Sequence, residues 1–154
     1  MLVTKRSGVL GVLVPETDLR VFSDPFFASV YHGVASAFTD HDAQVVLAMS
    51  KPGQPAETML SYLTSGRIDG AVIVSHHGTD LARATSRLTQ PVVFIGDPGV
   101  GGLPYVDVDS VQAAQVATRH LIGLGRRRIT TITGAMDMPA GRQRQQGFLD
   151  ALAE

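Results

Sequence analysis

The sequence predicts an α/β fold built on a doubly wound, mostly parallel sheet. Short apolar runs of strand length alternate with longer segments whose apolar residues recur at helical spacing. The first run, Val9–Val14, is continuously apolar and ends at Pro15, which is typical of a strand buried on both faces. Strands that alternate with helices of this length favour parallel pairing through right-handed crossovers.

Each expected element is bounded by turn or cap residues. Strands are expected at 9–14, 45–49, 71–74, 92–95 and 105–108, and a further one at 129–133. Helices are expected at 25–38, 56–65, 79–88 and 110–124, and a last one from about 140 to 154. Asp24 is expected to cap the first helix and Pro25 to occupy its first turn. Gly66 and Gly125 are natural helix stops.

Composition excludes several classes of protein. The 154 residues are enough for a sizeable core, and a net charge of −1 gives no electrostatic reason for direct binding to DNA or to an anionic membrane. The absence of cysteine excludes disulfides and thiolate metal sites. The first apolar run is too short for a signal peptide or a membrane span, so we expect a cytoplasmic protein.

The loop after the first strand is a candidate binding surface because ligands of parallel sheets bind beyond the carboxyl ends of the strands. It leads into Asp24, Phe26 and Phe27, which could line a pocket with a carboxylate and an aromatic face. The alternative is a helix cap followed by core phenylalanines. Phe27 fits the apolar stripe of the helix, whereas Phe26 lies off it and is the better pocket candidate.

The loop after the third strand contains Ser75, His76 and His77. Ser75 could donate a hydrogen bond to a ligand hydroxyl. Adjacent histidines rarely bind one metal ion together, and no glutamate or cysteine lies at a helpful spacing, so we expect a solvent-exposed loop and no metal site.

Arg144 lies near the expected start of the last helix, where a cation opposes the helix dipole. A guanidinium directed at a ligand oxygen would explain its presence, and a solvated helix face is the alternative. The glycine-rich run 96–102 lacks the Lys-Ser/Thr ending of a phosphate-binding loop. No nucleophile elbow, catalytic triad or paired catalytic carboxylates are found, so the sequence predicts neither an enzyme nor a cofactor.

In their order and spacing, short motifs along nearly the whole chain resemble the effector-binding domain of the lactose/galactose-repressor family. The matching stretches are 11–15 (GVLVP), 24–27 (DPFF) with Gly33, 67–73 (RIDGAVI), 91–97 (PVVFIGD), 106–109 (VDVD), 120–129 (HLIGLGRRRI) and 144–148 (RQQGF). The family more commonly has Asn where Asp24 stands and His where Arg126 stands, and neither change disturbs the expected fold.

The resemblance implies a periplasmic-binding-protein-like domain that binds a small polar effector, a sugar or a nucleoside-like molecule, in the cleft between two lobes. Residues 1–8 would be the remnant of a linker, 9–125 the first lobe, and 126–154 the first strand and helix of an incomplete second lobe. A homodimer is expected, with DNA bound only through a headpiece that these residues do not include. Carried over by position, the effector site would comprise Asp24, Phe26, Phe27, Ser75, His76 and Arg144.

Two alternatives come from other classes of protein. A solute-binding protein of a sugar transport system would have the same fold, although the stretches RRRI at 126–129 and RQQGF at 144–148 favour the repressor. A flavodoxin-like or nucleoside-processing enzyme is disfavoured by the missing catalytic residues.

Overall fold

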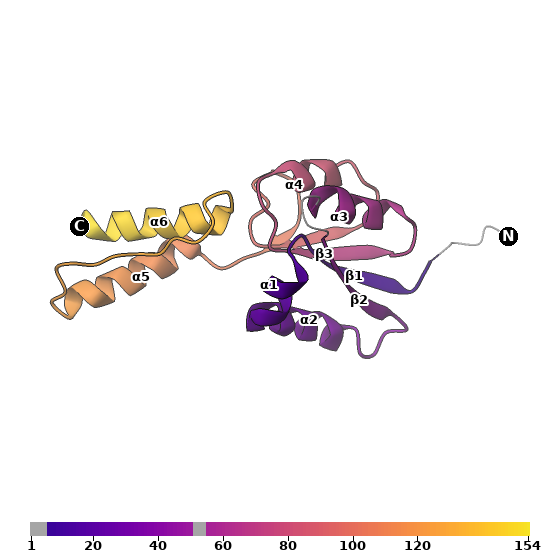
Figure 1. The fold of residues 1–154 in the computed structure, drawn as a ribbon, viewed down its shortest axis with the longest axis horizontal. Coiled ribbons are helices and arrows are strands. Elements are labelled where there is room, and N and C mark those ends of the chain that lie inside the picture. Colours follow the sequence, from indigo (N-terminus) through magenta and orange to yellow (C-terminus); the bar gives the residue numbers. More distant parts are fainter. Residues whose placement is uncertain (1–5, 51–54) are drawn as a thin grey trace.

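The computed structural model describes residues 6–50 and 55–154, which form a parallel sheet, helices on both of its faces, and a separate pair of helices (Figure 1). The strands are β1 (Val9–Val14), β2 (Gln44–Met49), β3 (Gly70–Val74), β4 (Val92–Ile95) and β5 (Tyr105–Val106). The helices are α1 (Asp18–Ser23), α2 (Pro25–Ala37), α3 (Pro55–Thr64), α4 (Asp80–Thr85), α5 (Ser110–Gly123) and α6 (Pro139–Leu152).

The strands lie in the order β2-β1-β3-β4-β5, and every neighbouring pair is parallel. β1 lies inside the sheet and pairs with β2 on one side and β3 on the other, so its backbone groups are satisfied along both edges. This arrangement confirms the predicted doubly wound α/β sheet.

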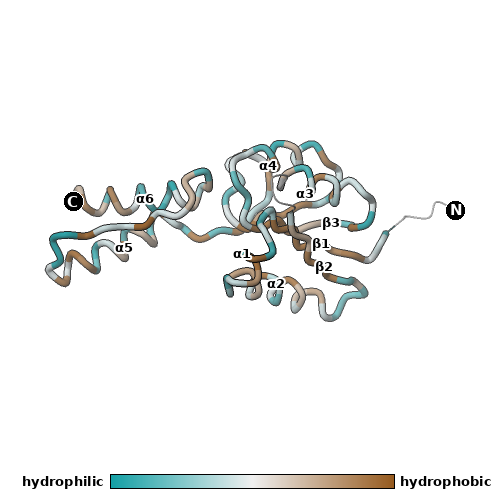
Figure 2. Tube along the Cα trace, viewed as in Figure 1, coloured by the Kyte–Doolittle hydropathy of each residue, from teal (hydrophilic) through white to brown (hydrophobic). Residues whose placement is uncertain are grey.

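Alternate residues of the strands face two different helical layers, as the two-residue period of a strand requires. Leu13, Ile73 and Phe94 are fully buried in the core that contains side chains of α3 and α4. Val12 and Val74 point to the opposite face and pack with side chains of α1 and α2. Figure 2 shows the hydrophobic residues concentrated in the strands between these layers. We call β1–β5 with α1–α4 the sheet body.

The helices α5 and α6 lie side by side at the carboxyl end of the sheet and pack against each other rather than on the sheet (Figure 1). Their backbones approach closely at Gly147, where an added Cβ would overlap the carbonyl oxygen of Val111. We call residues 110–152 the helical body. No helix in the described part of the chain is both long and apolar enough to span a membrane.

The strand predicted at 129–133 is wrong: this segment runs beside α5 and α6 without strand pairing. Its composition suits a strand, but a strand needs a neighbour to accept and donate its backbone hydrogen bonds, and the described residues place none beside it. Ile132 is accordingly 96% exposed.

Two further differences concern α1 and β5. The segment expected to be a polar loop between the first strand and Asp24 contains α1, which buries Val21 against the sheet. The strand expected at 105–108 is shorter, since β5 ends at Val106. α1 has six residues and β5 has two, and hydrophobic periodicity is a weak signal for elements this short.

Candidate functional site

A cleft of about 440 Å³ lies between the carboxyl end of the sheet and the start of the helical body. From the sheet body it is lined by Arg20, Asp24, Phe26, Phe27, Ser75, Ile95, Gly96 and Val106. Asp107 and Val108 of the connection between the bodies line it as well. The opposite wall consists of Thr133, Gly134, Ala135, Met138, Ala140, Gly141 and Arg144. The cleft therefore has one wall from each body, in the position where open parallel sheets bind ligands.

Asp24, Phe26 and Phe27 form the aromatic side of the cleft. The Asp24 carboxylate caps α2 by accepting a hydrogen bond from the Phe26 N–H at 3.0 Å. Phe27 is buried in the core, whereas Phe26 is 48% exposed and packs edge-on against Phe27 with ring centroids 5.5 Å apart. Each alternative for this loop therefore describes some of its residues. Asp24 caps the helix and Phe27 lies in the core, whereas the ring of Phe26 is exposed to the cleft.

Ser75 lies at the carboxyl end of β3 with a positive φ of 60°, a backbone conformation that is uncommon for a residue with a side chain. Its hydroxyl donates a hydrogen bond to the Glu16 carboxylate at 2.9 Å. The hydroxyl proton is thus engaged within the protein, and the oxygen remains able to accept a hydrogen bond from a ligand.

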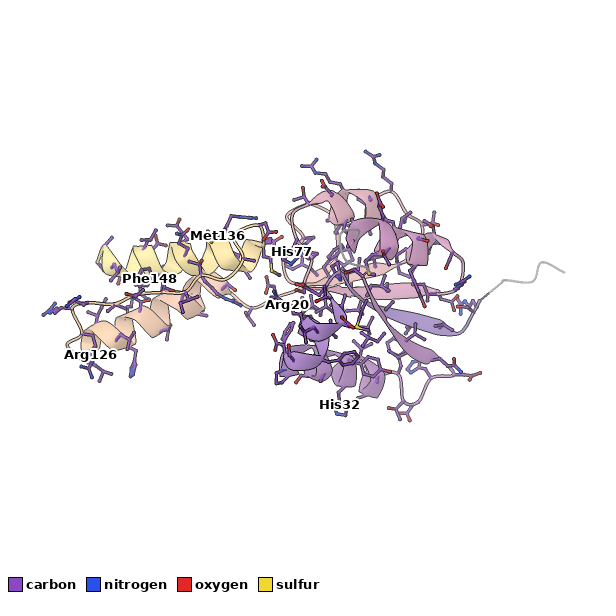
Figure 3. All side chains as sticks on the ribbon, in the orientation of Figure 1. Arg20, His32, His77, Arg126, Met136 and Phe148 are labelled. Carbon is purple, nitrogen blue, oxygen red and sulfur yellow. The ribbon has the colours of Figure 1, made fainter. Side chains whose placement is uncertain are left out.

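His76 does not line the cleft. It is 3% exposed and packs edge-on against Phe94, with ring centroids 5.2 Å apart. The neighbouring His77 contacts Glu16 and Asp137 instead, and Figure 3 shows His77 and Arg20 at the junction of the two bodies. The expectation of a solvent-exposed loop here is wrong, because one histidine enters the core and the other is held between two carboxylates.

Arg144 lines the cleft from the second turn of α6, because the helix begins at Pro139. The dipole argument applied to its predicted place in the first turn therefore carries little weight. Within the described ranges its guanidinium makes no hydrogen bond or ion pair. Arg142, by contrast, donates to the Met136 carbonyl at 2.9 Å and braces the turn before the helix.

Sequence reasoning missed Arg20 and Asp107 as cleft residues. Arg20 lies one helical turn after Glu16, and its Nε is 3.4 Å from a Glu16 carboxylate oxygen. Asp107, which also lines the cleft, accepts hydrogen bonds from the N–H groups of Asp97 and Val108, and these fix the position of its carboxylate. For Arg20 the sequence signal was its position shortly after the first strand, whereas Asp107 was expected inside a strand and was noted only as part of the stretch 106–109 (VDVD).

The cleft thus combines one exposed aromatic ring, two guanidinium groups and two carboxylates. Such a set can stack on an apolar ring face and hydrogen-bond to several hydroxyl groups at once. Among the described residues, no three side chains of the kinds that ligate metals come together.

Residues 7–154 match the family described as periplasmic binding proteins and sugar binding domain of the LacI family. The HTH-type transcriptional regulator CelR of Thermobifida fusca is 36% identical over 98% of this chain and 46% of its own length. The maltose regulon regulatory protein MalI of Escherichia coli is 30% identical over 96% of this chain and 43% of its own length. The chain therefore spans about half the length of the curated relatives it matches.

Comparison with solved structures indicates the same family. A complex of the transcriptional regulator CelR with cellobiose matches with a TM-score of 0.85 and 35% identity, over 96% of this chain and 46% of that one. A LacI family transcriptional regulator from Mycobacterium smegmatis matches with a TM-score of 0.79 and 28% identity, over 94% of this chain and 51% of that one. These relatives are transcription regulators and not enzymes, as the sequence predicts. Together with the match over residues 7–154, they show that this chain belongs to the family of periplasmic binding proteins and LacI-type sugar-binding domains.

Proposed function

We propose that the chain is the effector-sensing part of a LacI-type transcription regulator and binds a small sugar in the cleft between its two bodies. The regulators among its relatives support this function over the transport alternative. Binding of DNA would be carried out by a headpiece outside these residues, and homodimerisation stays a prediction from the family resemblance.

The observation that carries the proposal is the unpaired Arg144 opposite the exposed ring of Phe26 in one cleft. A guanidinium with no protein partner can donate hydrogen bonds to effector oxygens, and an aromatic face can stack on the apolar face of a sugar ring. Asp24, Phe27 and Ser75 would complete the site. His76 would support it only from the core, since it packs on Phe94 away from the cleft.

The class of effector is proposed to be a disaccharide rather than a nucleoside. One solved relative is described as a complex with cellobiose. The cleft also has carboxylates at both Asp24 and Asp107, and carboxylates accept hydrogen bonds from the many hydroxyl groups of a sugar.

The division into lobes is proposed as well. The sequence places the boundary at Gly125, with α5 in the first lobe. Because α5 packs along α6 and not on the sheet, we propose that the second lobe begins with α5 and that 107–109 connects the lobes.

Calorimetry with cellobiose, maltose and a nucleoside tests the proposal, with Arg144→Ala as the variant and Arg126→Ala as a control that removes the same charge far from the cleft (Figure 3). Loss of a hydrogen bond to a charged group typically costs about 1.5–3 kcal/mol, or roughly ten- to a hundredfold in affinity. We expect a loss of this size for Arg144→Ala and no change for Arg126→Ala, with the sugar recovered chemically unchanged. Equal affinity of the two variants would place Arg144 on a merely solvated helix face.

A further inference from the structure

The two bodies contact each other through His77. Its Nε2 lies 2.9 Å from a carboxylate oxygen of Glu16 in the sheet body. Its Nδ1 lies 2.8 Å from a carboxylate oxygen of Asp137, in the turn that leads into α6. Beside this contact the Gly78 N–H donates to the Asp137 carbonyl at 3.1 Å. The imidazole therefore joins the sheet body to the helical body at the junction of the two (Figure 3).

This geometry requires a protonated imidazole. A neutral histidine carries one N–H donor and one acceptor nitrogen, whereas the imidazolium carries two donors. Both ring nitrogens of His77 face carboxylate oxygens, which accept hydrogen bonds when ionised. When the ring loses its proton, one of the two hydrogen bonds must therefore be lost.

The hydrogen bond to Asp137 is the one that should break. The Glu16 side chain is only 11% exposed, while that of Asp137 is 59% exposed and can be solvated by water. Water can replace a lost donor at the exposed Asp137 more readily than at the buried Glu16, so the remaining N–H of a neutral ring is better used on Glu16. Glu16 also receives the hydroxyl of Ser75 and lies beside Arg20, which keeps it fixed in the sheet body.

We propose that His77 is a pH-sensitive latch that holds the helical body against the sheet body when protonated and releases it when neutral. The latch would act on the opening of the cleft and thereby on the positions of Ser75 and Arg20 relative to Arg144. This goes beyond effector binding, because it describes how the two walls are held in the absence of any ligand.

The titration behaviour of His77 supports this direction. Partial burial of the ring lowers its pKa, but the hydrogen bonds to Glu16 and Asp137 outweigh that effect and raise the pKa above its usual value of 6.5. A raised histidine pKa means that the contact stabilises the latched arrangement below pH 6.5 and is lost as pH rises through the raised value. The charged and titratable groups around the ring are Glu16 and Arg20 from the sheet body, Asp137 and Arg142 from the helical body, and His76 on its own loop.

The distance between the bodies can be measured without a ligand. The chain has no cysteine, so Ser36→Cys on α2 and Gln145→Cys on α6 provide two unique, exposed positions for spin labels. Pulsed electron paramagnetic resonance then reports the distance distribution at about pH 5.5 and about pH 8, on either side of the usual histidine range. We expect one narrow distribution at the lower pH and a broader or shifted one at the higher pH.

Three variants test whether His77 causes the pH dependence of this distance distribution. Asp137→Ala, an exposed change that should leave both bodies folded, is expected to give the broad distribution at both pH values. His77→Gln should remove the pH dependence, while the matched control His32→Gln on the exposed face of α2 should retain it.

A distribution in the unmodified sequence that does not change with pH would overturn the latch. So would a pH dependence that survives in His77→Gln. Neither outcome bears on sugar binding, which the calorimetry tests separately, so failure of the latch and failure of the proposed function can be told apart.

Discussion

The sheet body and the helical body use the same strand-then-helix pattern in their sequences but reach different degrees of burial. In the sheet body, apolar strand residues such as Leu13 and Ile73 are fully buried, because neighbouring strands and two helical layers enclose them. In the helical body, Val116 and Leu124 are each 60% exposed, and the described part of the chain places no strand beside the segment 129–133. Alternation in the sequence therefore predicts what a segment can form, and long-range pairing decides whether it forms.

The largest expected difference between the bodies is in the free energy of unfolding after removing one isoleucine side chain from each. Ile73→Ala leaves a cavity in the sheet core and should cost about 2–5 kcal/mol. Ile132→Ala removes an exposed side chain and should change stability by less than about 0.5 kcal/mol. Urea unfolding followed by circular dichroism measures both. Equal losses would mean that 129–133 packs against something in solution, most economically a second copy of the chain.

A pair of glycines tests how closely the helical body is packed. Gly147→Ala places a methyl group against the Val111 carbonyl and should cost about 1–3 kcal/mol through overpacking. Gly123→Ala near the end of α5 meets nothing within 4 Å and should instead stabilise by about 0.4–1 kcal/mol, because alanine loses less entropy in a helix. Thermal unfolding compares the two. If the Gly147→Ala variant unfolded at as high a temperature as the Gly123→Ala variant, α6 would be free to move away from α5.

The smallest expected effect is in the contacts near the two ends of the described chain, one with the sheet body and one with the helical body. Asp69 accepts hydrogen bonds from the Ser7 N–H and hydroxyl and from the Gly8 N–H, which hold the pKa of this carboxyl below its usual 3.8. In the helical body Arg119 pairs with Glu154 and lowers the pKa of that carboxyl below its usual 4.5. Both contacts should persist at neutral pH and be lost as pH falls through the lowered values.

The two ends should differ in their response to salt. An exposed ion pair is screened by added salt, whereas hydrogen bonds from neutral backbone groups are affected less. We therefore expect the NMR signals of Glu154 to shift with salt while the amides of Ser7 and Gly8 do not. An equal response at both ends would indicate that Asp69 acts through its charge and not through its hydrogen bonds.

Most of the sheet body could be predicted because its signals are local. The apolar run at Val9–Val14, the Asp24 cap with Pro25, and the stop at Gly66, which adopts a positive φ of 70°, each depend on a few adjacent residues. The candidate site could be predicted in part: Phe26 lines the cleft from the first turn of α2, as expected, and Arg144 lines it from α6, although from the second turn rather than the first.

The sequence by itself determined the strands of a parallel sheet, most of the helices, and the loops that would surround a cleft, since period, caps and breakers are properties of neighbouring residues. Only the tertiary structure decided that His76 packs on Phe94 while His77 joins Glu16 to Asp137. Each of these two carboxylates is about sixty residues away from His77 in the sequence. The tertiary structure likewise decided that α5 pairs with α6 and leaves 129–133 unpaired. These outcomes depend on which distant groups meet, and no local pattern in a single sequence records that.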